Sequence, residues 1–265
     1  MTSPISIQSE GAVEILTLDR PEKLNAVDVE MAEALSDYFG GLSTRKEIRV
    51  VIMRGAGKHF SAGADLDSPA FVPPGPGRAQ QQMAMQHLYS GIIKSMRSCP
   101  QPIIGLIHGA AAGAGFSLAL GCDVRLGTPR TLMSAAYLRV GLGGCDMGSG
   151  YLLPRLIGVS TASEFLLTGN FMDADRGVAC GLISTIVHDE EILDHGLKLA
   201  NDMLQAAPMG LRMTKESINA SLNVGSLDAG LALEDRQQVI LLDTEDHREA
   251  VNAFKEKRPP MFQDK

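Results

Sequence analysis

The sequence predicts an α/β fold, because short apolar or β-branched segments alternate with longer segments of helical periodicity and then give way to helices alone. From about Gly158 onward the pattern is almost wholly helical, apart from Leu182–Val187. This order is typical of an α/β core with a trailing helical layer. We therefore expect a core over residues 1–195 and a C-terminal helical region over residues 196–265.

The expected strands are short, and the first combines alternation with β-branched residues. They are Val13–Leu18, Val50–Met53, Pro102–Ile107, Asp123–Leu126 and Leu182–Val187. The expected helices carry apolar residues at spacings of three and four. They are Val29–Phe39, Gln80–Met96, a helix opening at Gly115–Leu120, Ile192–Gln205, Met209–Leu222, Leu227–Leu242 and Glu245–Phe254.

One segment, Ser68–Gly77, cannot form regular structure, because it holds four prolines and two glycines. We expect a surface loop that is mobile and becomes ordered over a bound ligand.

Composition limits the possible functions. The 265 residues are 45% hydrophobic, which is enough for a sizeable core. A net charge of −7 argues against nucleic acid or an anionic membrane as a partner. The N-terminus lacks a signal pattern, and no window approaches 18 consecutive apolar residues, so a cytoplasmic location is expected. The four cysteines show neither a CxxC pair nor metal-ligand spacing, so we expect reduced thiols and no metal site.

Three glycine-rich stretches are the strongest candidates for a binding site. They are Ser61–Asp65, His108–Gly115 and Gly141–Gly150. A dinucleotide fingerprint fails, because the position that should hold its third glycine is Leu118, and no P-loop lysine is present. Small residues before a helix let the backbone approach a ligand, and two N–H groups aimed at one point would form an oxyanion hole. From spacing alone, turns and close helix–strand packing explain these glycines somewhat better than a binding role does.

Several motifs, taken together and in order, resemble those of the crotonase family, the enoyl-CoA hydratases and isomerases. They are Leu18–Ala26, Phe60–Leu66, His108–Asp123 and Gly158–Leu182. The resemblance covers essentially the whole chain. It implies a crotonase-like fold, with a ββα spiral core and a C-terminal helical trimerisation region. It also implies an acyl-CoA enzyme that is a homotrimer or homohexamer and works through a thioester enolate held in an oxyanion hole.

The same resemblance implies roles for individual residues. The backbone N–H groups of Ala62 and Ala114 would hold the thioester oxygen, although Ala114 stands where the family usually has glycine. The residues expected to bind the substrate or its CoA moiety are Leu24, Ala26, Ala62, Gly63, Ala64, Asp65, Leu66, Gly113, Ser117, Tyr137, Leu138, Phe254 and Lys257. For Lys257 the alternative is a solvated lysine in a charged cluster. Coenzyme A is part of the substrate, and no separate cofactor or metal is implied.

The sequence departs from the family at the catalytic acids. The positions that carry glutamates in a typical hydratase are Ser117 and Tyr137 here. Asp146 instead matches the position of an aspartate in dienoyl-CoA isomerases and aryl-CoA dehalogenases of the family. We interpret Asp146 as the acid/base, with isomerisation favoured over hydration. The alternative for Asp146 is a cap on the helix starting near Ser149. His87 and Cys145 are weaker candidates for site residues.

Two other functions remain open at this point. One is a non-catalytic acyl-CoA-binding homologue, which the absence of both glutamates favours. The other is an aryl-CoA dehalogenase or thioester hydrolase in which Asp146 acts as a nucleophile.

Overall fold

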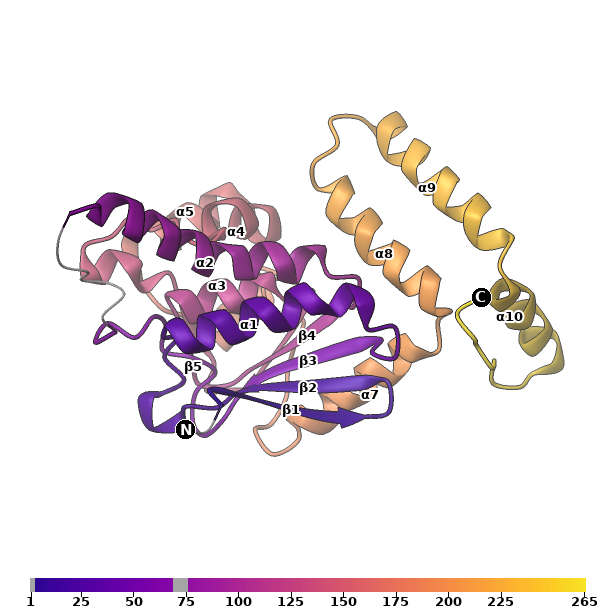
Figure 1. Cartoon of the computed structure of the whole chain (residues 1–265), viewed down its shortest axis with the longest axis horizontal. Coiled ribbons are helices and arrows are strands. Elements are labelled where there is room, and N and C mark those ends of the chain that lie inside the picture. Colours follow the sequence, from indigo (N-terminus) through magenta and orange to yellow (C-terminus); the bar gives the residue numbers. More distant parts are fainter. Residues whose placement is uncertain (1–2, 69–75) are drawn as a thin grey trace.

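The computed structural model describes residues 3–68 and 76–265. A six-stranded sheet lies at its centre with helices on both faces, and three helices project from one end (Figure 1). In spatial order its strands are β1 (Ile5–Glu10), β2 (Val13–Leu18), β3 (Val50–Gly55), β4 (Ile103–Ile107), β6 (Val124–Gly127) and β9 (Thr185–Ile186). Strand β1 is antiparallel to β2, and the other neighbours are parallel. The α/β prediction is confirmed.

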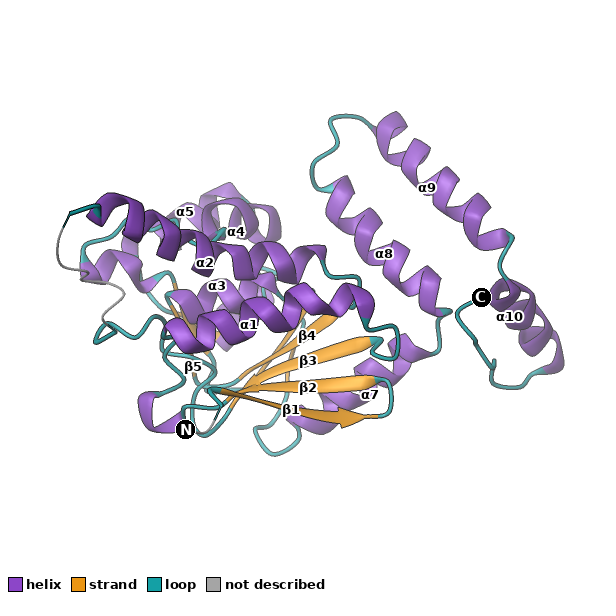
Figure 2. Cartoon of the chain, viewed as in Figure 1, coloured by secondary structure: helices purple, strands orange, loops and turns teal. Residues whose placement is uncertain are grey.

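Both faces of the sheet are covered (Figure 2). One face packs under α1 (Val29–Gly41), α2 (Arg78–Ser98) and α3 (Ala114–Gly121), and the other against α7 (Ile192–Leu204). In β2, Leu16 and Leu18 belong to the first apolar core, whereas Val13 and Ile15 belong to the second. Successive side chains point to opposite faces, so a strand buried on both sides must be apolar throughout.

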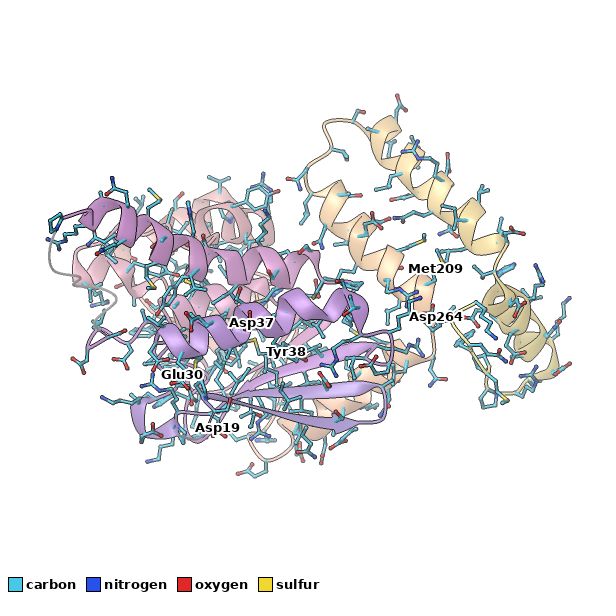
Figure 3. All side chains as sticks on the ribbon, viewed as in Figure 1. Asp19, Glu30, Asp37, Tyr38, Met209 and Asp264 are labelled. Carbon is cyan, nitrogen blue, oxygen red and sulfur yellow. The ribbon has the colours of Figure 1, made fainter. Side chains whose placement is uncertain are left out.

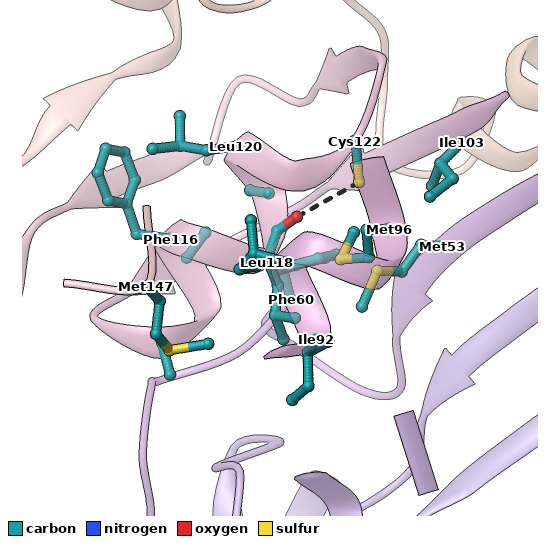
Figure 4. Close-up of a cluster of buried hydrophobic side chains, with 14 of the residues drawn as sticks. Met53, Phe60, Ile92, Met96, Ile103, Phe116, Leu118, Leu120, Cys122 and Met147 are labelled. Atoms are coloured by element: carbon teal, nitrogen blue, oxygen red, sulfur yellow. Dashed lines mark hydrogen bonds between the residues drawn. The ribbon is translucent and has the colours of Figure 1, made fainter. Parts of the chain in front are cut away.

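Helix α3 is the most deeply buried helix of the core, and every one of its residues is buried. Phe116, Leu118 and Leu120 belong to a cluster of buried side chains that also includes Met96 and Phe60 (Figure 4). A helix that is apolar on all sides is stable only inside a protein. The N-terminus of α3 is therefore held in a fixed place, close to the strand that precedes it.

The remaining core elements include a second, smaller sheet and several short helices. A second sheet orders β5 (Ala110–Ala112), β7 (Leu132–Ser134) and β8 (Met172–Asp173). The helices α4 (Ser149–Ile157), α5 (Val159–Thr168) and α6 (Ala174–Ala179) follow, and a 3-10 helix covers Ala136–Val140. The sequence pattern did not predict β1 or this second sheet. Five of the six residues of β1 are exposed, and the strands of the second sheet have two or three residues, which is too short for a periodic signal.

The expected boundary between residues 195 and 196 needs correction. It falls inside α7, and the apolar face of that helix packs on the sheet through Leu193, Leu197 and Ala200. The projecting region begins instead with α8 (Pro208–Ser221) and continues through α9 (Leu227–Leu242) and α10 (Glu245–Glu256) (Figure 1). We call these three helices the arm.

A buried ion pair joins the arm to the core. The Lys215 ammonium on α8 donates to the carbonyls of Met96 (2.9 Å) and Gln101 (2.8 Å) and lies 2.9 Å from Asp123 Oδ2. Asp123 also pairs with Arg97 at 2.9 Å. A buried charge is tolerated only with such full pairing.

The end of the chain also returns to α8. Asp264, which lies near Met209 in Figure 3, makes a two-pronged ion pair with Arg212 at 2.6 and 3.0 Å.

Two further expectations concern the loop and membranes. The loop expected over Ser68–Gly77 falls largely outside the described residues, because positions 69–75 are not among them.

Within the described ranges, no helix has both the length and the apolar character needed to cross a membrane.

Asn25 connects the segment after β2 to the one after β3. Its backbone lies in the left-handed region (φ 55°) and its side chain is buried. The side-chain amide donates to the carbonyls of Ala56 and His59, both at 2.8 Å, and Oδ1 accepts the N–H of Arg20 at 3.0 Å. Asn25→Ala would leave two buried carbonyls without these bonds and would put alanine, which tolerates the left-handed region less well than asparagine, at positive φ. We expect it to lower the free energy of unfolding by about 3 kcal/mol in urea titrations.

The control is Asn201→Ala, because Asn201 is exposed on α7 and its side chain makes no hydrogen bond among the described residues. It should change stability by less than about 0.5 kcal/mol. Equal effects of the two substitutions would contradict the structural role of Asn25.

Candidate active site

A cavity of about 360 Å³ lies between α2, the N-terminus of α3 and the segment that follows the 3-10 helix. Its lining is mostly apolar, with a few polar groups, as in sites for small ligands. The lining residues are Ala62, Gly63, Ala64, Leu66, Gln82, Met85, Gln86, Tyr89, Gly113, Ala114, Ala136, Tyr137, Val140, Leu142, Asp146 and Met147. Two of the glycine-rich stretches meet here, and the third contributes Leu142, Asp146 and Met147.

Two glycines allow the backbone segments at the cavity to touch. Gly63 has φ 110°, and a Cβ on it would lie 2.8 Å from the carbonyl oxygen of Ala112 and 3.5 Å from the nitrogen of Ala114. Gly113 caps α3 with φ 50° and ψ −121°. Residues with a side chain rarely adopt these backbone conformations, so glycine is required at both positions.

The backbone donors differ from the expected pair. The N–H of Ala62 donates to the carbonyl of Leu24 at 3.0 Å, so it is not available to a ligand. This corrects the prediction for Ala62. Ala64 forms a parallel bridge with Val27, but the bonds of that bridge use the carbonyl of Gly63 and the N–H of Asp65. Among the described residues, the N–H groups of Ala64 and Ala114 have no acceptor, and both residues line the cavity.

Ser117 and Tyr137, which replace the two glutamates, face each other. Their hydroxyl oxygens are 2.5 Å apart, and the Tyr137 hydroxyl is also 2.7 Å from the carbonyl oxygen of Gly113. Burial raises the pKa of Tyr137 well above its usual value, so the hydroxyl remains protonated. Ser117 is completely buried and is not among the residues that line the cavity. Tyr137 does line the cavity.

Asp146 is half-buried and lines the cavity beside Leu142 and Met147. One carboxylate oxygen accepts the N–H of Met147 at 2.7 Å and a hydrogen bond from the side-chain amide of Gln86. The alternative of a helix cap is wrong. The N-cap of α4 is Gly148, and it is the backbone N–H of Asp146 that donates to the Ser149 hydroxyl, at 3.0 Å.

Sequence reasoning missed the contribution of α2. Gln82, Met85, Gln86 and Tyr89 lie at spacings of three and four, which places them on one face of that helix, and all four line the cavity. The helical period of α2 was recognised, but nothing in it says that this face meets Asp146, sixty residues further along the chain. His87, on the same helix, is exposed and does not line the cavity.

Three of the residues expected to contact CoA lie beside the cavity and not in its wall. Leu24 is 47% exposed and accepts the Ala62 N–H through its carbonyl. The carbonyl of Ala26 accepts a hydrogen bond from Arg20 at 2.6 Å, and Asp65 pairs with Arg20 at 3.1 Å. The polar groups of Ala26 and Asp65 thus stabilise the segment that carries Ala64.

Three other expected residues are not brought to the cavity within one chain. Leu138 packs toward Gly144 and Gly169. Phe254 is 87% exposed on α10, and Lys257 directly follows that helix. Helix α10 lies at the outer end of the arm, far from the N-terminal half of α2, which lines the cavity (Figure 1). The physical reason is that the arm projects away from the core that forms the cavity.

Residues 8–265 match the family described as enoyl-CoA hydratase/isomerase. The chain belongs to that family and is an acyl-CoA enzyme of the hydratase/isomerase type.

Individual relatives agree with this assignment. The chain is 34% identical over 252 residues to a Mycobacterium tuberculosis protein described as "Probable enoyl-CoA hydratase EchA12", covering 94% of this chain and 88% of the relative. It is 34% identical over 253 residues to the 1,2-epoxyphenylacetyl-CoA isomerase of Escherichia coli, covering 96% and 95%. The crystal structure of enoyl-CoA hydratase from Bacillus anthracis superposes with a TM-score of 0.92 at 29% identity, covering 99% and 100%.

Gly63→Ala tests the close approach of the two segments. The added Cβ would press on the Ala112 carbonyl and displace the neighbouring Ala64 and Ala114 donors. We expect stability to fall by about 1–3 kcal/mol, and affinity for butyryl-CoA, measured by titration calorimetry, to fall roughly tenfold or more.

Gly40→Ala is the matched control, because Gly40 lies in α1 with no atom within 4 Å of the added Cβ. It should leave affinity unchanged and raise stability by about 0.5–1 kcal/mol. Undiminished affinity in Gly63→Ala would exclude this backbone contact as part of the binding site.

Proposed function

We propose that this enzyme isomerises an acyl-CoA thioester by moving a proton between carbons of the acyl chain, with Asp146 as the acid/base. The observation that carries the proposal is the composition of the cavity wall. Among the described residues that line the cavity, Asp146 contributes the one carboxylate, and two backbone N–H groups without an acceptor there, those of Ala64 and Ala114, lie in the same wall.

The chemistry divides between these groups. The two N–H groups would bind the thioester oxygen and stabilise the negative charge that develops on it. The positive end of the α3 dipole adds to this stabilisation. The Asp146 carboxylate would remove a proton from a carbon of the acyl chain, and the electrons of the broken C–H bond move into the thioester to form an enolate. In an unsaturated acyl chain this enolate is conjugated with the C=C bond, so the same carboxyl group can return the proton to the far carbon of that bond, and the double bond moves one position along the chain.

Isomerisation is favoured over hydration, because hydration needs a water molecule held by two polar groups. The two positions that carry glutamates in a typical hydratase are here a neutral pair of hydroxyls bonded to each other and to the backbone. A separate cofactor is not part of the proposal. A reducing compartment such as the cytoplasm suits the exposed free thiol of Cys145.

Asp146→Asn tests the role of the carboxylate without knowledge of the natural acyl group. Exchange of the α-protons of butyryl-CoA in D₂O, followed by NMR, reports enolate formation directly. Because asparagine keeps the shape and removes the base, we expect exchange to slow by roughly 10²–10⁴-fold while the dissociation constant changes little.

Asp37→Asn, on the exposed side of α1, is the control and should exchange at the wild-type rate. Binding without exchange in the wild-type protein would favour the non-catalytic acyl-CoA binder. Loss of the thioester, or a covalent adduct that disappears in Asp146→Asn, would instead favour the nucleophilic function. Wild-type exchange in Asp146→Asn would remove Asp146 from the mechanism.

We also propose that the chain assembles as a homotrimer or a pair of trimers. The arm exposes large apolar side chains on α9, among them Leu227 (76% exposed) and Val239 (66%). Exposed apolar patches of this kind mark protein–protein interfaces. Phe254 and Lys257 can contact a bound CoA only if the cavity belongs to a neighbouring copy, because their own arm carries them away from it.

Sedimentation velocity at micromolar concentration should therefore give the mass of three or six chains. Replacing both Leu227 and Val239 with aspartate should shift the protein toward smaller species, because charges would then face a buried interface. A wild-type protein that sediments as a stable monomer would rule out this assembly.

A further inference from the structure

The carbonyl of Gly113 and the N–H of Ala114 belong to the same peptide group. The N–H is one of the two unpaired donors in the cavity wall. The carbonyl accepts two hydrogen bonds on the opposite side, from the Tyr137 hydroxyl at 2.7 Å and from the N–H of Ser117 at 3.1 Å. A side chain that occupies a lost glutamate position therefore contacts the donor peptide directly.

The lengths of the contacts fix the direction of the protons. The Ser117 hydroxyl lies 2.5 Å from the Tyr137 oxygen and 3.1 Å from the carbonyl oxygen of Asp146. If Tyr137 donated to Ser117, its oxygen and the Gly113 carbonyl would face each other at 2.7 Å without a proton between them, which is repulsive. Donation from Ser117 to Tyr137, and from Tyr137 to Gly113, puts a proton in both of the shortest contacts, and the contact left without a proton is then the longest one, between the Ser117 hydroxyl and the backbone carbonyl of Asp146.

We propose that Tyr137 is a positioning residue that orients and polarises the Gly113–Ala114 peptide, with Ser117 holding the tyrosine hydroxyl in place. The inference rests on the proposed function, in which the N–H of this peptide binds the thioester oxygen. A hydrogen bond accepted by a peptide carbonyl strengthens the N–H of that peptide as a donor, and chains of hydrogen bonds reinforce each other. The Ala114 N–H thus meets the thioester oxygen as a stronger and better aligned donor.

The backbone at this point needs such support. Gly113 adopts a conformation open to glycine and little else, so the peptide that follows it can rotate more freely than one between ordinary residues. A hydrogen bond to its carbonyl restricts that rotation. Burial raises the pKa of Tyr137, so the hydroxyl keeps its proton at neutral pH and remains a donor.

The test compares three variants by infrared spectroscopy of bound butyryl-CoA labelled with ¹³C at the thioester carbonyl. In the wild-type protein the carbonyl stretch should fall in frequency on binding. Tyr137→Phe should lose a large part of that shift and slow α-proton exchange roughly tenfold, with a nearly unchanged dissociation constant. Ser117→Ala, which leaves the tyrosine donor present, should give a smaller loss. Tyr38→Phe should match the wild type, because it removes another buried tyrosine hydroxyl, one bonded to Glu14 at 2.9 Å.

A second measurement separates polarisation from packing. Incorporation of 3-fluorotyrosine at position 137 makes the phenol a stronger donor at nearly the same size, so it should increase the frequency shift. It also covers the case in which Tyr137→Phe fails to fold. An unchanged shift and exchange rate in Tyr137→Phe, or no response to the fluorotyrosine, would overturn the inference. No shift in the wild-type protein would refute the oxyanion hole itself and the inference with it.

Discussion

The close contact of three backbone segments is the constraint on which the candidate site depends. Residues 61–64 lie between Asn25–Val27 on one side and residues 110–114 on the other. The Ser61 hydroxyl donates to the Asn25 carbonyl at 2.7 Å, and a Cβ on Gly115 would lie 2.5 Å from the carbonyl of Ser61. Backbones this close must bond to each other wherever they can, and the N–H groups left over point into the cavity. The donor pair thus follows from the packing and requires no dedicated side chain.

Much of the fold could be predicted from the sequence, because its helices and buried strands are long enough to show their periods. Strand β1 could not, because it is an edge strand held through its backbone pairing with β2, and most of its side chains are exposed. The expected boundary at residue 195 failed for a different reason. Helices α7 and α8 are both amphipathic, and the pattern does not say that α7 covers the sheet while α8 leaves it.

The segments that form the site could be predicted from the sequence, but the particular N–H donors and side-chain hydrogen bonds within it could not. Gly63 turns the chain between Ala62 and Ala64, and the acceptor that occupies the Ala62 N–H comes from Leu24, far away in sequence. Choosing between two neighbouring alanines therefore requires the tertiary structure. The replaced glutamates were recognised as a departure, whereas the bond between Ser117 and Tyr137 depends on how α3 meets the 3-10 helix. The Asp146–Gln86 contact was hidden for the same reason.

The buried Lys215 on α8 has a consequence for assembly. Because its ammonium is bonded to two carbonyls and to Asp123, α8 cannot tilt away from the core without exposing that carboxylate or leaving a charge unpaired in the interior. The orientation of α8 relative to the core is thus fixed within the single chain, before it associates with another copy. Association of preorganised surfaces loses less conformational entropy than association of flexible ones. In the assembly that we propose, a single lysine within the monomer would therefore help to determine the geometry in which separate chains come together.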